Sequence, residues 1–226
     1  MYHHISEEEG SGLTISAPKL EAQLKLLVNH NYRSWHFSEL MNTRELQSRK
    51  NVVITFDDAY VSQLEYAVPL LQKYNLKATF FVPLGYLGKT DSWNTGQLDI
   101  MTAEQLKSLP DLIELGYHSY YHEKYHEMPL EKIDEDLQMS KKTVNASGLR
   151  FREVIAYPYG KYPKEANARL QFQWLLQEFG INYGLRIGNR INRFPFKKPY
   201  EIQRLDIKGQ YSLIRFQRKL RYGKFL

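Results

Sequence analysis

The chain alternates between short apolar runs and longer stretches in which apolar residues recur every three or four positions. Runs rich in apolar, β-branched or aromatic residues stand at positions 52–56, 78–83, 113–117, 151–156, 181–187 and 202–207. Short runs of this kind are typical of buried strands, and the spacing between them is typical of helices that pack on a sheet. Strands separated by helices indicate βαβ units and a parallel sheet. The pattern therefore predicts an α/β fold.

Amphipathic segments predict helices over residues 61–74, 131–144, 163–180 and 211–222. Pro69 predicts a kink in the first of them. Thr102 and Gln105 have the spacing of a capping box and predict another helix start. About seven βα units could close into a barrel or form an open doubly wound sheet, and the periodicity does not distinguish the two.

Composition limits the class of protein. With 226 residues and 42% hydrophobic residues, the chain is long enough for one large domain, residues 1–226, with a substantial core. The absence of Cys excludes a disulfide-stapled module and a thiolate metal site. No segment approaches the roughly 20 apolar residues that a membrane span needs, and no apolar leader stands at the N-terminus. These features predict a cytoplasmic protein.

The net charge of +6 is concentrated near the C-terminus. Residues 186–226 hold 12 Lys or Arg and two Asp or Glu, whereas the rest of the chain is slightly acidic. A basic closing helix at about 211–226 is most often a solvated face. It could also contact an anionic lipid, a membrane surface or a phosphorylated glycan. We expect no nucleic-acid partner, because no nucleic-acid-binding motif accompanies the charge.

Two adjacent carboxylates, Asp57 and Asp58, end the apolar run at 52–56. In α/β folds, ligands and catalytic groups gather at the carboxyl ends of strands. Neighbouring strand residues point to opposite sides, so a bend is needed to bring both side chains to one site. The alternative interpretation is a helix N-terminus, because a helical pattern follows at once and Asp favours the first turn.

Two histidines follow another predicted strand. His118 and His122 come directly after residues 113–117, and on a helical turn two residues four apart share a face. One carboxylate and two imidazoles form a common ligand set for a catalytic metal, with a position left for water. The spacing therefore predicts a metal site.

A third motif, Ala156-Tyr157-Pro158-Tyr159-Gly160, follows the strand at 151–156. Together with Thr55-Phe56-Asp57-Asp58 and His118-Ser119-x-x-His122, in this order, it gives the chain a resemblance to the polysaccharide deacetylases. This family is also called the NodB homology domain or carbohydrate esterase family 4, and the match is to its Tyr-Pro-Tyr-Gly subgroup. The resemblance spans residues 2–207. It implies a distorted, incomplete (β/α)7 barrel with the site at the carboxyl ends of the strands.

The resemblance implies a metal-dependent hydrolase that removes N-acetyl groups from acetamido sugars of a polysaccharide, oligosaccharide or glycolipid. By this likeness Asp57 is the general base, and the main-chain N–H of Tyr157 or Tyr159 completes the oxyanion site. The metal would most often be Zn2+, with Co2+, Ni2+ or Fe2+ as alternatives. Its implied ligands are Asp58, His118 and His122.

The chain departs from the family pattern in two places. Ala156 stands where many members have an Arg that orients the base, and Arg204 is the candidate replacement. The late Leu-x-Ile-His motif that supplies the general acid is missing, and residues 204–207 stand in its place. His3 is the candidate acid, with His4 as the alternative, because the Tyr-His strand end lies at the rim of the site in this family.

Other interpretations remain open. The missing late His suggests a catalytically inactive glycan-binding module, and a deformylase on a carrier-linked sugar would use the same attack of water on an amide. A phosphoryl-transfer or nucleic-acid-processing metalloenzyme rests on the basic C-terminus alone. His126 is not expected to bind the metal. Trp93 lies in a predicted loop at 85–96, where it could face a sugar ring or cover the core.

Overall fold

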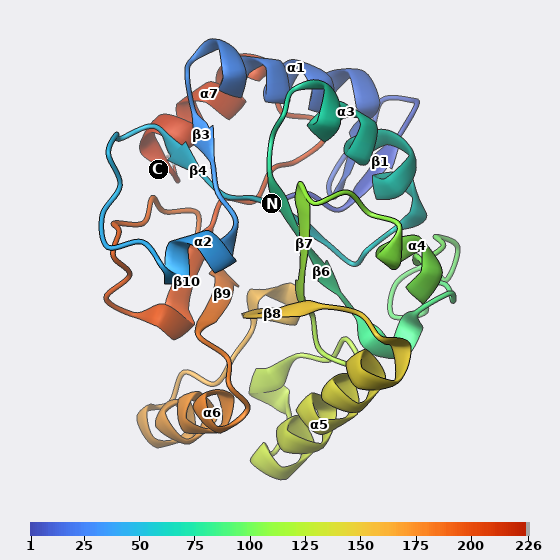
Figure 1. Ribbon diagram of the computed structural model, residues 1–226, viewed down its shortest axis with the longest axis vertical. Helices are drawn as coiled ribbons and strands as arrows, with labels where there is room; N and C mark the ends of the chain where they lie inside the picture. The colour runs from blue at the N-terminus through green and yellow to red at the C-terminus, as the bar shows by residue number, and fades with distance from the viewer. Residues whose placement is uncertain (225–226) are drawn as a thin grey trace.

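Six of the predicted apolar runs form one parallel sheet at the centre of the molecule (Figure 1). The computed structural model describes residues 1–224, and its main sheet has the strand order β10-β9-β8-β7-β6-β5. Every neighbouring pair in it is parallel. The sheet curls into an incomplete barrel in a single domain. Its strands are β5 (Ile54–Asp57), β6 (Ala78–Val82), β7 (Ile113–Tyr117), β8 (Phe151–Ala156), β9 (Tyr183–Ile187) and β10 (Ile202–Arg204).

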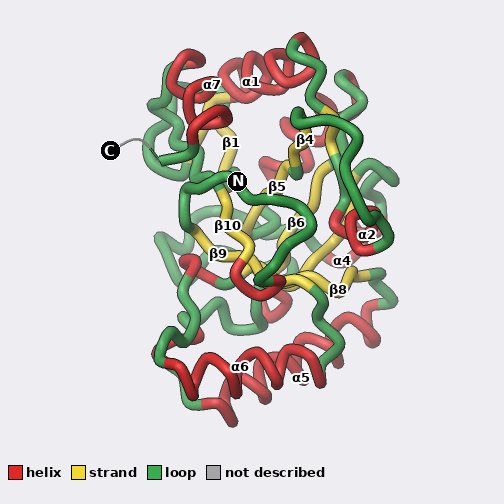
Figure 2. The backbone as a smooth tube through the Cα atoms, turned by 90° about the vertical axis from the view of Figure 1, so that its left-hand side faces the viewer, coloured by secondary structure: helices red, strands yellow, loops and turns green. Residues whose placement is uncertain are grey.

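Helices surround this sheet and gather at the two ends of the molecule (Figure 2). In both views α5 and α6 lie side by side at one end, and α1 and α7 at the other. The helices are α1 (Ala17–Asn29), α2 (Phe37–Met41), α3 (Val68–Lys73), α4 (Ala103–Lys107), α5 (Leu130–Ser147), α6 (Ala166–Glu178) and α7 (Leu213–Tyr222). Two short parallel pairs stand beside the main sheet, β1 (His4–Ser6) with β2 (Thr14–Ser16) and β3 (Arg33–Ser34) with β4 (Asn51–Val52).

The strands are apolar because both faces of the sheet are covered. All four residues of β5 and all five of β6 are buried, and Phe56, Phe80 and Phe81 have no exposed surface. Continuous apolar runs are typical of parallel strands buried on both faces. Each fully buried Phe stabilises the fold by about 1.5–3 kcal/mol. This rigid sheet fixes the positions from which the functional side chains project.

The barrel remains open between its edge strands, β5 and β10. The N-terminal residues partly bridge this seam. Tyr2 N donates to Thr55 O at 2.8 Å, and Asp57 N donates to Tyr2 O at 2.9 Å. On the other side, Met1 N donates to Leu205 O at 2.8 Å. This pairing carries the chain toward the carboxyl end of β5, where His3 follows.

Several predicted helix signals are confirmed. The capping box is present, since Gln105 N donates to the Thr102 hydroxyl at 3.2 Å and Thr102 N donates to the Gln105 side chain at 2.8 Å. The helical stretch predicted at 61–74 is interrupted as expected: a π-helical turn at Gln63–Ala67 precedes α3, and Pro69 stands in the first turn of α3. Pro69 has no N–H to donate to the preceding turn, and π-helical turns are among the known causes of an irregular helix.

The closing helix predicted at about 211–226 is α7, which ends at Tyr222, and residues 225–226 lie outside the described part of the chain. Within residues 1–224, none of the helices has the length and apolar character needed to cross a bilayer.

Candidate metal centre and active site

The turn after β5 brings both aspartates to the same end of the sheet. β5 ends at Asp57, and the next two residues, Asp58 and Ala59, have φ values of 72° and 52°. A left-handed conformation is uncommon for non-glycine residues and supplies the bend that the sequence required. Helical structure begins only after Tyr60. The interpretation of the Asp pair as a helix cap is therefore wrong.

The loop after β7 carries the two histidines, but it is not the helical turn that the spacing predicted. Residues 118–122 have no regular secondary structure, and Ser119 and His122 have φ values of 67° and 56°. The Ser119 hydroxyl accepts a hydrogen bond from His122 N at 2.8 Å. The two rings meet because this loop folds back on itself, with ring centroids 5.0 Å apart.

A buried aspartate on α5 holds the histidine loop in this shape. Asp136 has no exposed surface, and its Oδ2 accepts hydrogen bonds from Tyr120 N and Tyr121 N, both at 2.9 Å, and from the Ser119 hydroxyl at 3.1 Å. Its Oδ1 accepts from the Tyr125 hydroxyl at 2.8 Å. The sequence analysis missed this residue, which looked like one more acidic position on an amphipathic helix.

Three side chains converge where these two turns meet. His122 Nε2 lies 3.1 Å and His118 Nε2 lies 3.4 Å from the same oxygen, Asp58 Oδ1. One ligand atom from each residue lies within 4.8 Å of the other two, and all three residues are buried. The predicted ligand residues are thus brought together. The third histidine along this segment, His126, lies beside Glu127 and not in the cluster.

The chemistry of this cluster fits a metal cation. His118 Nδ1 lies 2.7 Å from Ala156 O, and donation to that carbonyl turns the lone pair of Nε2 toward Asp58. Asp58 Oδ1 is buried and completes no hydrogen bond within residues 1–224. Lone pairs that face one another in a dry site repel unless a cation lies between them. The donor set therefore suits a divalent metal.

Two of the three pKa shifts in the cluster favour positive charge at this site. Burial opposes ionisation of Asp58, but the imidazoles of His118 and His122 beside it hold the pKa of its carboxyl well below the ordinary value. Burial also opposes protonation of His118, yet the charges of Asp57 and Asp58 raise its pKa. The pKa of His122 is lowered, because burial dominates there.

Asp57 forms an ion pair with Arg204. The two guanidinium Nη atoms donate to the two carboxylate oxygens, one of them at 2.8 Å, across 147 positions of the sequence. Both residues are buried. Burial opposes ionisation of Asp57, but the Arg204 guanidinium outweighs it and holds the pKa of the carboxyl below its ordinary value. Asp57 therefore stays an anion within a bidentate clamp.

His3 also lies at Asp57, whereas His4 does not. His3 Nε2 lies 3.7 Å from Asp57 Oδ2, and burial lowers the pKa of the His3 imidazole. Gln63, which the sequence analysis missed, fixes this approach by donating to His3 O at 3.0 Å and to Asp57 O at 2.6 Å. His4 contacts the Ser62 hydroxyl at 2.9 Å.

The third motif forms a tight turn beside the histidines. Tyr157 N donates to Leu185 O at 3.0 Å as part of the sheet, so it is not free to stabilise an oxyanion. This leaves the N–H of Tyr159, whose φ is 57° and whose ring packs edge-on against His122, with centroids 5.0 Å apart. Burial raises the pKa of the Tyr159 hydroxyl.

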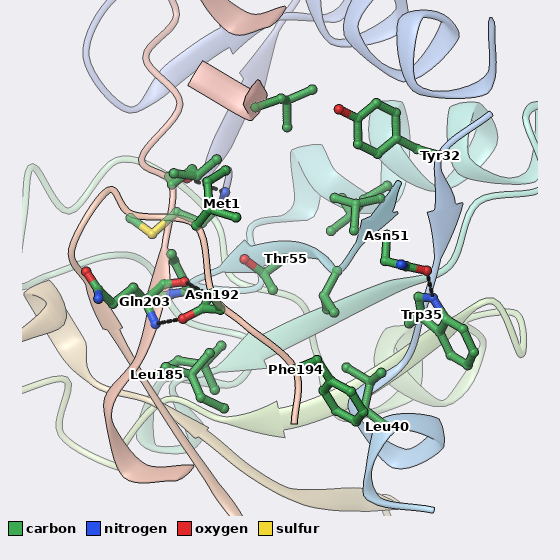
Figure 3. A pocket seen from close by; sticks show the side chains of 18 of the residues that line it. Met1, Tyr32, Trp35, Leu40, Asn51, Thr55, Leu185, Asn192, Phe194 and Gln203 are labelled. Atoms are coloured by element: carbon green, nitrogen blue, oxygen red, sulfur yellow. Dashed lines mark hydrogen bonds between the residues drawn. The ribbon is translucent and has the colours of Figure 1, made fainter. Parts of the chain in front are cut away.

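One cavity lies away from these residues, at the open seam of the barrel (Figure 3). Its volume is about 680 Å³, and apolar side chains such as Trp35, Leu185 and Phe194 line it. Arg204 reaches its wall, but Asp58 and the two site histidines do not. The candidate chemistry therefore lies outside this cavity.

Comparisons with known proteins agree with this arrangement. The family model described as polysaccharide deacetylase matches residues 44–174. The chain is 31% identical over 169 residues to a Bacillus subtilis (strain 168) protein provisionally named polysaccharide deacetylase YxkH, covering 73% of this chain and 57% of that protein. It is 27% identical over 198 residues to the poly-β-1,6-N-acetyl-D-glucosamine N-deacetylase of Staphylococcus aureus (strain MSSA476), covering 80% of this chain and 67% of that enzyme.

Solved structures match over nearly the whole chain. The Streptococcus pyogenes deacetylase PplD in complex with acetate superposes with a TM-score of 0.79 at 20% identity, covering 97% of this chain and 96% of that one. IcaB from Ammonifex degensii gives a TM-score of 0.79 at 21% identity, covering 97% and 94%. At these identities the likeness concerns the fold.

Proposed function

The chain belongs to the polysaccharide deacetylase family, and from this premise we propose that it is a metal-dependent hydrolase that removes N-acetyl groups from acetamido sugars. The observation that carries the proposal is the convergence of Asp58, His118 and His122 beside the ionised Asp57. The name of the staphylococcal relative supports a β-1,6-linked N-acetylglucosamine polymer as the first substrate to test.

The metal would be held by Asp58, His118 and His122, and when bound it would supply a more acidic water and a polarised acyl carbonyl. Zn2+ is the first candidate, and Co2+, Ni2+ or Fe2+ suit the same ligands. Asp57 would take the proton from the attacking water, since its carboxylate is ionised and its Oδ2 lies 4.0 Å from His118 Nε2, at the edge of the cluster. Arg204 would keep that carboxylate in position and charged.

Hydrolysis breaks the C–N bond of the acetamide, so the departing nitrogen needs a proton. His3 is the nearest candidate donor, but burial keeps its imidazole neutral near neutral pH. We infer a relay in which the proton that Asp57 takes from water passes over 3.7 Å to His3 Nε2 and from there to the amine. The Tyr159 N–H would stabilise the negative oxygen of the tetrahedral intermediate. Acetate and a free amino sugar are the products.

The Arg204 clamp predicts a shift in pH dependence. Arg204→Met removes the cation that lowers the Asp57 pKa and leaves the burial that raises it, so the pKa should rise. The base is then protonated at higher pH, and the acidic limb of kcat/KM should move to higher pH. Lost positioning should also reduce kcat by about 100-fold. Arg204→Lys, which keeps the charge, should show a smaller shift, and identical pH profiles for all three proteins would contradict the clamp.

We further propose that the basic C-terminal segment contacts an anionic lipid or membrane surface. Along α7, Arg215, Arg218 and Arg221 are exposed, and Ile214 beside them is 65% exposed. Such a face combines attraction to anionic lipid with an apolar contact. The protein should co-sediment with phosphatidylserine-containing vesicles at low salt and be released at high salt. Equal recovery with phosphatidylcholine vesicles would refute this contact.

The proposed activity is tested by acetate release. Metal-loaded protein should liberate acetate from β-1,6-linked N-acetylglucosamine oligomers and leave free amines on them. Formate release from N-formylated oligomers, without acetate release, would move the assignment to a deformylase. Binding of the oligomers without either product would support an inactive glycan-binding module instead.

A further inference from the structure

The two histidines of the metal cluster differ in how their second ring nitrogen is held. His118 Nδ1 is held by Ala156 O at 2.7 Å. His122 Nδ1 is buried and has no hydrogen-bond partner in the part of the chain that the structure covers. A histidine that binds a metal almost always donates its other N–H to an oxygen, which fixes the orientation of the ring. In His122 the orientation must therefore be fixed in another way.

Aromatic packing fixes the orientation of the His122 ring instead. The Trp93 ring lies on the face of the His122 imidazole, with centroids 4.0 Å apart and an interplanar angle of 27°. Tyr86 supports Trp93 from the side, edge-on, with centroids 4.6 Å apart. Aromatic rings in such arrangements attract one another beyond the effect of the area they bury. The Trp93 face turned toward His122 is thus not available to a sugar.

The loop that carries Trp93 is built around a buried carboxylate. Asp91 has no exposed surface, and its two oxygens accept hydrogen bonds from Leu98 N and from the Asn94 side chain, both at 3.0 Å. Its main-chain oxygen accepts from Asn94 N at 2.8 Å and Gly96 N at 3.1 Å. These bonds span both sides of Trp93 and hold the indole in a defined place.

The same loop is tied to the turn that presents Asp58. Met101 N donates to Ala59 O and Val61 N donates to Asp99 O, both at 2.9 Å, which gives a short antiparallel bridge between Tyr60 and Ile100. Ala59 directly follows Asp58 in the chain. One loop therefore supports two of the three proposed ligands: Asp58 through the main chain of the residues that follow it, and His122 through Trp93.

We propose that Trp93 is a positioning residue for the metal ligand His122, and that residues 89–101 act as a brace that sets the spacing between His122 and Asp58. This inference rests on the proposed function, because it assumes a metal at the cluster. Since His122 Nδ1 already lacks a hydrogen-bond partner, loss of the indole removes the main contact that orients this ring, and the ligand spends less time in the binding geometry.

The test uses Co2+ as the probe, with affinity measured by chelator competition and ligand geometry by the visible absorption of the bound ion. Trp93→Ala should weaken Co2+ binding by about 10–100-fold, which is the range found when the outer partner of a metal ligand is lost. The visible spectrum of the bound ion should also change. Trp93→Phe, which keeps an aromatic face, should bind nearly as well as wild type, and Trp93→Leu should lie between. Trp174→Ala is the matched control, because this tryptophan is 59% exposed on α6.

Equal Co2+ affinity and equal spectra across the Trp93 series would overturn the inference, even if KM for the sugar rises, because Trp93 would then serve the substrate alone. If circular dichroism shows that Trp93→Ala fails to fold, the test rests on the Co2+ affinities and spectra of Trp93→Phe and Trp93→Leu. Failure of the proposed function would give a different result from failure of this inference. In that case the wild-type protein itself would bind no Co2+ at the cluster, or would bind it and release no acetate.

Discussion

His118→Ala should lose both the bound metal and acetate release. His118 is one of the three buried residues proposed as ligands, and a carbonyl at 2.7 Å holds its other nitrogen in place. Removal of a direct ligand should weaken binding by more than the roughly 10–100-fold that loss of an outer partner costs. Metal content after gel filtration, measured by mass spectrometry, should fall from one ion per chain to almost none.

His126→Ala is the matched control for this change. His126 lies only a few residues further on, contacts Glu127 at 3.5 Å and takes no part in the cluster. This variant should keep its metal and its activity. Metal retention in the His118 variant, or equal loss in both variants, would contradict the assignment of the ligands.

Asp57→Asn should abolish most activity while the metal stays bound. Asp57 is the ionised carboxylate next to the cluster and is not one of its three ligands. An amide cannot accept a proton from water, so kcat should fall by about 10²–10⁴, the range attributed to general base catalysis. Co2+ affinity and spectrum should stay close to those of wild type.

Asp57→Asn also replaces the charged partner of Arg204. The loss of the base and the loss of this ion pair therefore need to be separated. Arg204→Met leaves the carboxylate in place and should retain more activity at high pH than Asp57→Asn, because its base can still ionise there. If Asp57→Asn releases acetate at the wild-type rate, the base is a different residue.

Much of this site could be predicted, because its residues stand at the carboxyl ends of apolar runs. The strand before Asp57, the bend needed at Asp58 and the strand before His118 are local features, and each was found in the hydrophobic pattern. The barrel class came from the resemblance, since periodicity does not distinguish a barrel from an open sheet. The order of the three motifs pointed to Asp58, His118 and His122, which the structure brings together.

The remaining features depend on contacts between residues that are distant in the sequence, and no local sequence pattern predicts such contacts. The helical turn expected for the histidines was wrong because Asp136, on the following helix, pulls the loop into another shape through its hydrogen bonds to Tyr120, Tyr121 and Ser119. The Arg204–Asp57 pair joins residues 147 positions apart. Gln63 was missed because a polar residue at the start of a helix normally faces solvent.

Trp93 is the clearest example of a residue whose contacts the sequence could not predict. From the sequence, the loop indole could have faced a sugar or covered the core, and neither prediction included a metal ligand as its neighbour. Its stacking on His122 depends on two loops from different βα units that meet at one end of the sheet.

We propose this buried cluster as a metal site that drives amide hydrolysis. The most direct measurement is to strip the protein with a chelator, titrate Zn2+ or Co2+ back, and follow bound metal and acetate release from N-acetylglucosamine oligomers in the same samples. We expect no release from stripped protein, then a rate that rises with bound metal and levels off at one ion per chain. Release that is indifferent to stripping, or a filled site that releases no acetate from any acetamido glycan, would contradict the claim.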